Sequence, residues 1–405
     1  MAERAEVAIV GGGIMGTSLA FALTRLGVRD VLLLERGTLA AGASGKTGAL
    51  LRQHYTNVPE ATLAHRSLQI FAHWADVVGG DCGFAPAGSI ITVATRGADA
   101  VNVARMRRNV ALLNSLGVKA EVIAPGRLRE LQPFTVAEDI DAAVYEPESG
   151  YVDAVAATRG MAEAALRGGA RLRERCAVTG LRAQDGRVVG LETEAGPVEA
   201  GTVVVAGGAW SLPLLAALGV EVPLQAQRVQ VVVLNRPLAM PESGTMCYVD
   251  TAAGFFCRDA GPNRTLAGVG GGEFHDVVDP FDYDERLTPG FGETVKRFMA
   301  RRMPAMAEAS TLYGYACLYD LSPDAHPILG GVEGYDNLHL MLGFSGAGFK
   351  KGPATGQALA ELIVHGKASF VDLTPFRLSR FQDEAWRAPW SPDEYSFSTD
   401  FGHKF

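Results

Sequence analysis

Residues 6–35, EVAIVGGGIMGTSLAFALTRLGVRDVLLLE, decide the fold of this chain. An apolar run, a glycine turn, an amphipathic stretch, a second apolar run and an acid follow one another, which predicts strand, turn, helix and strand. In such a unit Gly11 makes the tight turn, Gly13 lets the backbone approach a pyrophosphate, and Gly16 lets the helix pack closely on the strand. The N–H groups at the start of the helix then face the phosphates, and Glu35 accepts hydrogen bonds from ribose hydroxyls.

This unit predicts a dinucleotide-binding fold rather than an ordinary tight turn, because strand, helix and terminal acid all fall at the spacing that the fingerprint needs. The carboxylate of Glu35 would repel a 2′-phosphate, which argues against NADP. The unit by itself does not distinguish FAD from NAD.

The composition excludes several classes of function. The 405 residues are enough for two domains and carry a net charge of −8, without a basic run longer than two residues, so an electrostatic footprint for nucleic acid is missing. No apolar stretch approaches the roughly 18 residues of a membrane span, and the N-terminus lacks the cleavage site of a signal peptide. Five cysteines form no CxxC pair and leave one over, which indicates a reducing compartment. We expect a cytoplasmic protein with a small-molecule partner.

Two further apolar strands run into glycine-rich turns, at residues 202–211 and 338–352. Pro353 follows the second turn and opens an expected helix, where a helix start tolerates proline. Strand, glycine turn and helix therefore recur at both ends of the chain, with longer strands of an antiparallel sheet between residues 222 and 318. We expect a discontinuous nucleotide-binding domain (1–83, 148–221 and 319–381), a substrate-binding domain inserted twice (84–147 and 222–318), and a C-terminal aromatic tail (382–405).

The remaining pattern predicts helices and one hairpin. Helical periodicity is present at residues 60–78, 99–116, 125–131, 154–167, 291–302 and 354–365. Asp185-Gly186 supplies a hairpin turn between two short strands.

The glycine turn and three later segments resemble the D-amino-acid oxidase superfamily of flavoproteins. The segments are 42–48 (GASGKTG), 203–210 (VVVAGGAW) and 343–350 (GFSGAGFK). The most specific stretch, 316–330 (ACLYDLSPDAHPILG), is similar to the branch that holds sarcosine oxidases, glycine oxidase and N-methyl-amino-acid oxidases. The resemblance spans about residues 1–381. It implies FAD rather than NAD, oxidation of a carbon–nitrogen bond, and a mixed α/β fold in which a Rossmann-like FAD-binding domain of the glutathione-reductase type carries a discontinuous antiparallel-sheet substrate domain.

The resemblance also implies which residues hold FAD. The first unit would bind the ADP half, the loop at 44–47 would line the flavin, Val178 would meet the adenine, and 343–350 would wrap the isoalloxazine edge. The helix after Pro353 would point its positive N-terminus at the N1–C2=O end of the ring. The full set is Gly11, Gly13, Ile14, Met15, Gly16, Glu35, Arg36, Ser44, Gly45, Lys46, Thr47, Val178, Ala206, Gly207, Trp210, Cys317, Gly343, Gly346, Gly348, Phe349 and Lys350.

Two basic residues match positions that bind the substrate carboxylate in sarcosine oxidase-like members. Arg52 and Lys350 would hold the carboxylate and place the amine carbon against flavin N5, so that catalysis is by positioning. Phe256 and Arg258, in the stretch 254–258 (GFFCR), are expected near the ring face. A tyrosine that binds a carboxylate is expected in this stretch, and its replacement by phenylalanine weakens the case for a simple sarcosine-like substrate.

Cys317 lies where single-chain sarcosine oxidases carry FAD through a thioether, in a Cys-x-Tyr-x-x-Thr-Pro-Asp pattern. Heteromeric relatives usually have glycine there. This chain has Cys317, Tyr319, Pro323 and Asp324, with Ser322 in place of threonine. The hypothesis is covalent attachment of FAD at Cys317, and the alternative is a buried, unreactive thiol.

One residue of the oxidases is missing. They have a lysine over the flavin ring that helps oxygen accept electrons, whereas 266–273 (LAGVGGGE), and the whole of 222–295, contain no lysine. The electron acceptor is therefore left open between oxygen, a quinone and a partner protein.

Three functions remain. The preferred one is oxidation of a secondary or N-methyl amino acid by hydride transfer to the flavin, giving an imine that hydrolyses. The alternatives are the flavin subunit of an amino-acid dehydrogenase complex and a non-catalytic flavoprotein that acts as an assembly factor. No metal site is expected, because His275, His326 and His339 are too scattered, and homo-oligomerisation is left open.

Overall fold

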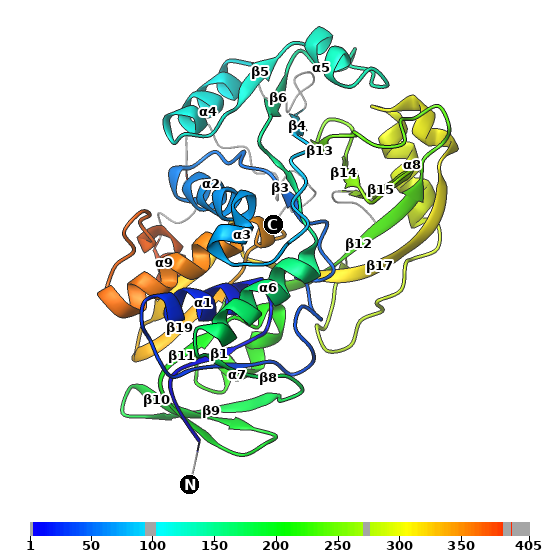
Figure 1. Cartoon of the computed structure of the whole chain (residues 1–405). Coiled ribbons are helices and arrows are strands. Elements are labelled where there is room, and N and C mark those ends of the chain that lie inside the picture. The colour runs from blue at the N-terminus through cyan, green and yellow to red at the C-terminus, as the bar shows by residue number, and fades with distance from the viewer. Residues whose placement is uncertain (1–2, 94–102, 270–275, 384–389, 391–405) are drawn as a thin grey trace.

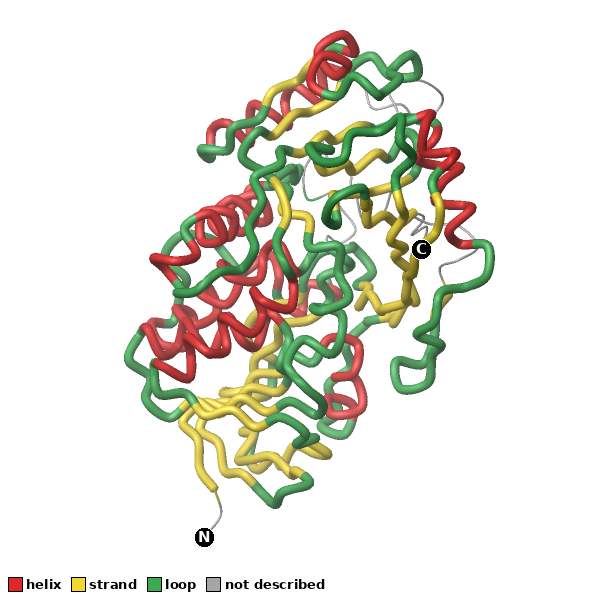
Figure 2. Tube along the Cα trace, turned by 45° about the vertical axis from the view of Figure 1, so that its right-hand side comes forward, coloured by secondary structure: helices red, strands yellow, loops and turns green. Residues whose placement is uncertain are grey.

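The computed structural model of the chain describes residues 3–93, 103–269, 276–383 and 390. Two large sheets organise these residues, one in the lower part of the molecule in Figure 1 and the other in its upper and right-hand part. Figure 2 shows several helices stacked against one side of the first sheet.

The first sheet is built around β1, which lies between β2 and β11 and runs parallel to both. Its strand order is β18-β19-β11-β1-β2-β8, and the β9–β10 hairpin joins it through β11. The parallel centre follows from the helical crossovers that connect its strands. The strands are β1 Glu3–Val10, β2 Val31–Leu34, β8 Arg171–Arg173, β9 Val178–Gln184, β10 Arg187–Thr193, β11 Val198–Val205, β18 Ile328–Val332 and β19 Tyr335–Leu342.

Alternate residues of these strands enter two separate cores, because successive side chains of a strand point to opposite faces. On one face Val7, Ile9 and Val204 pack against the helices α1 (Ile14–Arg25), α6 (Ala154–Arg167) and α9 (Gly352–His365). On the other face Ala8, Val10 and their neighbours pack against the β9–β10 hairpin and the short helix α7 (Leu212–Ala216). Burial on both faces explains why these strands are continuously apolar in sequence.

The second sheet has the order β16-β12-β15-β14-β13-β4-β6-β5, with β17 paired to the other side of β12. The described strand pairs within residues 222–318 are antiparallel, as expected, and the sheet has one parallel contact where β13 meets β4. Residues 84–147 supply β4 beside a strand from 222–318, and the two chain directions coincide there. The strands are β4 Ser89–Thr92, β5 Glu121–Ile123, β6 Ala143–Glu146, β12 Gln225–Asn235, β13 Cys247–Asp250, β14 Phe255–Asp259, β15 Arg264–Val269, β16 Asp276–Val277 and β17 Ser310–Leu321.

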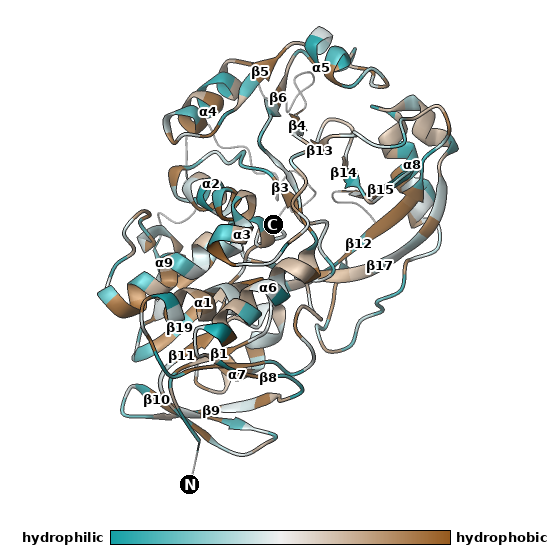
Figure 3. Ribbon diagram, viewed as in Figure 1, coloured by the Kyte–Doolittle hydropathy of each residue, from teal (hydrophilic) through white to brown (hydrophobic). Residues whose placement is uncertain are grey.

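The apolar run 231–234 of β12 is brown in Figure 3, whereas the helices α4 and α5 carry teal residues. Leu234 and Val232 on one face of β12 pack against the helix α8 (Phe291–Ala300). Helix and sheet thus bury one apolar core for the second sheet. The remaining elements are α2 Val58–Ala72, α3 Trp74–Val77, α4 Val103–Ser115, α5 Pro125–Leu131, the small β3–β7 sheet (Leu50–Leu51 with Gly150–Tyr151), and the 3₁₀ turns η1 Gly208–Ser211, η2 Pro304–Glu308, η3 Phe349–Lys351, η4 Thr374–Phe376 and η5 Leu378–Gln382.

Most predicted elements are present with shifted ends. The expected helix at 60–78 is two helices, because the backbone at His73 leaves the helical region. Of the expected helix at 99–116, residues 103–115 are helical, and residues 99–102 lie outside the described ranges. The expected hairpin turn has positive φ angles at Asp185 and Gly186, as a tight hairpin requires. The domain boundaries stay a prediction.

The C-terminal tail is described only at residues 382, 383 and 390. The ring of Trp390 packs against His326 (centroids 4.1 Å apart) and Phe376 (5.2 Å). All five cysteines are buried and none forms a disulfide. Within the described ranges, no helix combines the length and the apolar character that crossing a bilayer requires.

Candidate functional site

A cavity of about 840 Å³ lies along the edge of the first sheet where β1, β2 and β11 end. It has the size of a large ligand site. It brings together most of the predicted cofactor residues, namely Gly11, Gly13, Ile14, Met15, Glu35, Arg36, Ser44, Lys46, Thr47, Val178, Ala206, Gly207, Trp210, Cys317, Gly346, Gly348 and Phe349.

The glycine turn leaves no room for side chains. Gly11 has φ +117°, and a Cβ there would lie 2.6 Å from the carbonyl oxygen of Ala206. A Cβ on Gly16 would lie 2.0 Å from the carbonyl oxygen of Gly11, and one on Gly45 would lie 2.2 Å from that of Ala40. These contacts explain why glycine occupies all three positions. The two contacts in the glycine turn, at Gly11 and Gly16, place the start of α1 directly at the cavity.

Glu35 is held rigidly at the cavity rim. Its two carboxylate oxygens accept hydrogen bonds of 2.7 Å from the backbone N–H groups of Gly12 and Gly37. Each carboxylate oxygen has a second lone pair, which can accept a hydroxyl hydrogen bond. Ser44 accepts a hydrogen bond of 2.9 Å from the N–H of Ile14 and so ties the loop at 42–48 to the first turn of α1.

A loop that the sequence analysis missed covers the outer wall of this cavity. Residues 278–290 connect β16 to α8, and Phe281, Tyr283 and Glu285 of this loop line the cavity. The loop contacts three predicted cofactor residues. The Arg36 guanidinium lies 5.4 Å from the ring centroid of Phe281 and 4.7 Å from that of Trp210. Lys46 pairs with Glu285 at 2.5 Å, and Trp210 Nε1 donates to Pro280 O at 2.6 Å. Its sequence signal is a run of aromatic and acidic residues without regular periodicity.

Asp320 is a second lining residue that sequence reasoning missed. Its carboxylate accepts a hydrogen bond of 2.8 Å from the N–H of Gly343, the first glycine of the turn after β19. Burial raises the pKa of Asp320 to about 6. No sequence pattern marks Asp320, because it is a single acid near the end of β17.

Cys317 lies at the junction of the larger cavity with a smaller one of about 100 Å³. It is carried by β17, opposite Val229 of β12. Burial raises the pKa of the Cys317 thiol to about 12. The thiol therefore faces the cavities in its protonated form at neutral pH.

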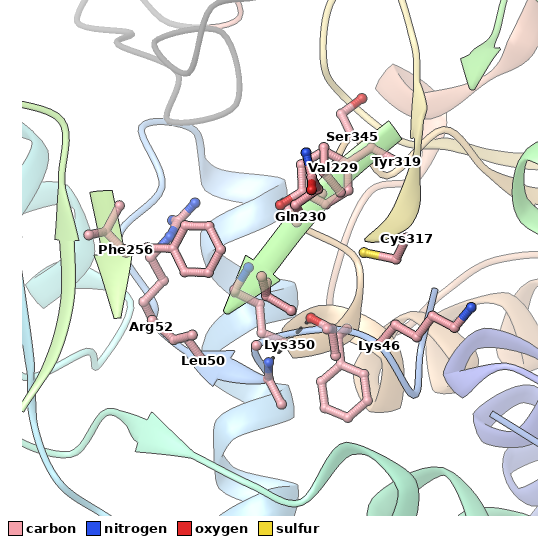
Figure 4. A pocket seen from close by; sticks show the side chains of 18 of the residues that line it. Lys46, Leu50, Arg52, Val229, Gln230, Phe256, Cys317, Tyr319, Ser345 and Lys350 are labelled. Atoms are coloured by element: carbon pink, nitrogen blue, oxygen red, sulfur yellow. Dashed lines mark hydrogen bonds between the residues drawn. The ribbon is translucent and has the colours of Figure 1, made fainter. Parts of the chain in front are cut away.

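The smaller cavity contains the two predicted carboxylate-binding residues, Arg52 and Lys350. Figure 4 shows Arg52 and Phe256 on one side of it and Cys317 and Lys46 on the other, with Lys350 between them. Three basic side chains, those of Lys46, Arg52 and Lys350, line this cavity, and none of its described lining residues is acidic. The remaining walls are mostly apolar or aromatic, so an anionic group would meet positive charge in a poorly solvated space.

Arg52 and Lys350 occupy different environments. Arg52 is 7% exposed, donates to the carbonyl oxygen of His54, and lies 4.6 Å over the ring of Tyr55. Burial, together with the charges of Arg52 and Lys351, holds the pKa of Lys350 well below its usual value. A bound carboxylate would supply the opposite charge that favours the ammonium form.

The side chains that follow Gly254 lie partly in the core of the second sheet and partly in the smaller cavity. Phe255 is fully buried in the core of the second sheet, and Phe256 lines the smaller cavity. Arg258 donates to the carbonyl oxygens of Gly48 and Asp259 and lies 4.8 Å from the Tyr151 ring centroid. Arg258 therefore holds the end of the loop at 42–48, and a catalytic role for it stays a prediction.

The other predicted residues lie behind or outside these walls. Gly343 has φ +69° and forms the turn that Asp320 binds. His275 and part of the lysine-free stretch 266–273 lie outside the described residues. Lys46 lines both cavities, and its ammonium group pairs with Glu285 of the loop after β16. No group of three metal-ligating side chains occurs in the described part of the chain.

The residues present fit a dinucleotide with a flavin at its inner end. The turn without side chains admits a pyrophosphate at the start of α1, the fixed Glu35 carboxylate can bind ribose hydroxyls, and the cavity continues to Cys317.

Comparison with known proteins agrees with this geometry. The family model DAO, described as FAD dependent oxidoreductase, matches residues 6–362. The mouse mitochondrial pyruvate dehydrogenase phosphatase regulatory subunit is 28% identical over 90% of this chain and 42% of its own length. The 4-methylaminobutanoate oxidase (formaldehyde-forming) of Paenarthrobacter nicotinovorans is 29% identical over 92% of this chain and 45% of its own length.

The chain thus spans less than half the length of these two relatives. Among solved structures, the L-proline dehydrogenase of P. horikoshii superposes with a TM-score of 0.84 and 25% identity, covering 94% of this chain and 99% of the other.

Proposed function

Because this chain belongs to the DAO family of FAD-dependent oxidoreductases, we propose that it oxidises the C–N bond of a secondary or N-methyl amino acid. The observation that carries the proposal is that Arg52 and Lys350 meet in a cavity lined by basic side chains and no described acid, next to the larger cavity that fits FAD. A carboxylate is the substrate group that this charge distribution favours.

The chain's own residues bind and orient the substrate. The guanidinium of Arg52 presents a fork of donors that suits a carboxylate, and Lys350 adds a second, point-like charge. Phe256 and Val229 offer apolar walls on which the carbon chain packs and from which water is excluded. When bound, FAD supplies the acceptor for a hydride from the carbon next to the amine.

Proton handling needs no separate base if the substrate binds as a free amine. The cations around the cavity disfavour an ammonium and favour the neutral amine. The product imine then hydrolyses in water, to a ketone or an aldehyde according to the carbon oxidised.

The names of two similar proteins support this substrate class. One is an oxidase of 4-methylaminobutanoate, an N-methyl amino acid, and the other is a dehydrogenase of L-proline, a secondary amino acid. Cys317, at the junction of the cavities, is the proposed site of covalent attachment of FAD.

The test is an anaerobic titration of the purified holoenzyme with N-methyl and secondary amino acids, following the loss of flavin absorbance at about 450 nm. We expect bleaching by at least one such amino acid and much weaker bleaching by its decarboxylated amine. In Arg52→Met this preference should shrink by tenfold or more, because the Arg52 guanidinium is removed. Absence of bleaching by every amine tested would overturn the proposal.

A second candidate is the flavin subunit of a dehydrogenase that passes electrons to a partner protein or quinone. The absence of lysine from residues 222–295 favours it, and so does the dehydrogenase name of a close structural neighbour. Readmission of air after bleaching decides between the two. Reoxidation within seconds, with formation of peroxide, identifies an oxidase, whereas reoxidation over many minutes identifies a dehydrogenase.

A third candidate is a flavoprotein without catalytic activity. One relative is named a regulatory subunit, which favours this candidate. It predicts bound FAD that no amine reduces.

A further inference from the structure

A buried ion cluster lies directly behind the wall of the smaller cavity. Glu60, in the first turn of α2, is 3% exposed and accepts from both Lys351 Nζ and His326 Nδ1, the latter at 2.6 Å. Lys351 is completely buried at the end of η3, the turn that also contains Lys350. Consecutive residues thus serve two purposes: Lys350 lines the cavity and Lys351 is anchored to Glu60.

The same cluster touches Arg52 through one aromatic ring. Lys351 Nζ lies 4.7 Å from the ring centroid of Tyr55, and the Arg52 guanidinium lies 4.6 Å from the same centroid. Both cations therefore pack on a side chain three residues beyond Arg52. A shift of Lys351 would therefore move Lys350, its neighbour in η3, and would change the packing of Arg52 on the Tyr55 ring.

Charge also points to Glu60. Arg52, Lys350, Lys351 and His326 gather in this region, and Glu60 is the carboxylate that the structure pairs with Lys351 and His326. Burial alone would raise the pKa of Glu60, but Lys351 and His326 hold it well below its usual value. Glu60 therefore offsets the charge of Lys351 behind the wall of the smaller cavity.

We propose that Glu60 is a positioning residue for the substrate carboxylate: by holding Lys351 it fixes the turn that presents Lys350 to the smaller cavity. This inference rests on the proposed function of Arg52 and Lys350. It assigns to α2 and to the Glu60–Lys351 pair a part in choosing carboxylated substrates.

The deciding variant is the double substitution Glu60→Gln/Lys351→Met in the holoenzyme. It removes both charges of the Glu60–Lys351 pair together, so neither is left buried without the other, and the fold is spared the larger penalty of a single substitution. The amide of Gln at position 60 can still form a hydrogen bond with His326 Nδ1. The ion pair between Glu60 and Lys351, which holds η3 against α2, is nevertheless lost. We expect KM for the best amino-acid substrate to rise about tenfold or more, while kcat and the KM of its decarboxylated amine (pyrrolidine for proline, dimethylamine for N-methylglycine) change less than about threefold.

A matched control comes from the buried pair Arg302–Asp250 beside the second sheet, in which both side chains have 0% exposure. Arg302→Met/Asp250→Asn also removes a buried ion pair. It should leave the ratio of the two KM values at the wild-type level, even if the melting temperature falls. The single variant Glu60→Asp, which keeps the charge on a shorter side chain, should recover part of the discrimination.

The outcomes separate the inference from the function on which it rests. If the wild-type enzyme does not distinguish the amino acid from its amine, the carboxylate site itself is wrong. If the wild type distinguishes them and Glu60→Gln/Lys351→Met keeps the wild-type ratio, Glu60 only stabilises the fold and the inference is overturned. The same conclusion follows if the Arg302/Asp250 control changes the ratio as strongly.

Discussion

A Cβ atom on Gly11 would lie 2.6 Å from the carbonyl oxygen of Ala206, so the turn after β1 and the end of β11 leave no room for a side chain between them. Gly11→Ala should therefore push these strands apart at the cavity where FAD binds. We expect the variant to be purified with less than a tenth of the wild-type flavin content and to melt at a lower temperature.

The control for this prediction is Gly27→Ala. Gly27 also has a positive φ (+87°), but a Cβ there meets no atom within 4 Å. Both substitutions place an alanine at a positive φ angle, which costs roughly 1–2 kcal/mol. Only Gly11→Ala adds the collision with the Ala206 carbonyl oxygen. Equal flavin loss in the two variants would show that backbone strain, rather than the contact with Ala206, is responsible.

Lys350 should make the binding of carboxylates depend on pH. Its pKa in the free protein lies well below the usual value for lysine, and a bound anion favours the charged form. Affinity should therefore be full below the pKa of the free protein and fall by up to tenfold per pH unit above it. Titration with butyrate, which carries no amine, measures this at several pH values. Lys350→Met should bind butyrate more weakly and without this decrease, and an unchanged pH profile in the variant would contradict the prediction.

The folded protein should become less stable as the pH rises, because the buried carboxyl group of Asp320 then ionises. Burial raises its pKa from 3.8 to about 6, so the folded state binds more protons than the unfolded state between these values. Stability is therefore highest below about pH 4, falls through this window and stays lower above pH 6, by at most about 3 kcal/mol. Asp320→Asn still has an oxygen to accept from Gly343 and should be more stable than wild type at pH 7.5 in urea unfolding. Its advantage should disappear near pH 4, and a difference that is the same at both pH values would exclude Asp320 as the cause.

Cys317 should keep the flavin attached when the protein is denatured. After precipitation with trichloroacetic acid we expect the yellow colour in the pellet for wild type and in the supernatant for Cys317→Ser, which removes the sulfur. Cys257→Ser is the control, because Cys257 is also fully buried but lines neither cavity. A colourless wild-type pellet would mean that Cys317 is an ordinary buried thiol.

The glycine turns of the cofactor site could be predicted from the sequence, whereas the loop that covers its outer wall could not. Gly11, Glu35 and Gly343 are recognisable because each meets a local conformational or charge requirement at fixed spacing. Phe281 and Glu285 reach the same cavity from a loop without periodicity, and their place depends on tertiary contacts with Arg36 and Lys46 that no local pattern encodes.

The same limit applies to the substrate site. Arg52 and Lys350 were inferred from family motifs, and the structure places both at one cavity. The partner of the next lysine, Glu60, lies 291 residues away along the chain and looks in sequence like one more acid at a helix start. Asp320 was hidden for a comparable reason, since its effect arises from burial rather than from its neighbours in sequence.

The pairing of β1 between β2 and β11, with β19 beyond β11, has a consequence for synthesis on the ribosome. The turn at Gly11 emerges first, but the walls contributed by β17 and η3 are about three hundred residues behind it. At roughly 5 to 20 residues per second this delay is about 15 to 60 s. The nascent chain must pass through that interval with an incomplete binding cleft, so FAD is captured only after β17 and η3 have been made, and a nascent chain arrested before residue 317 should carry none.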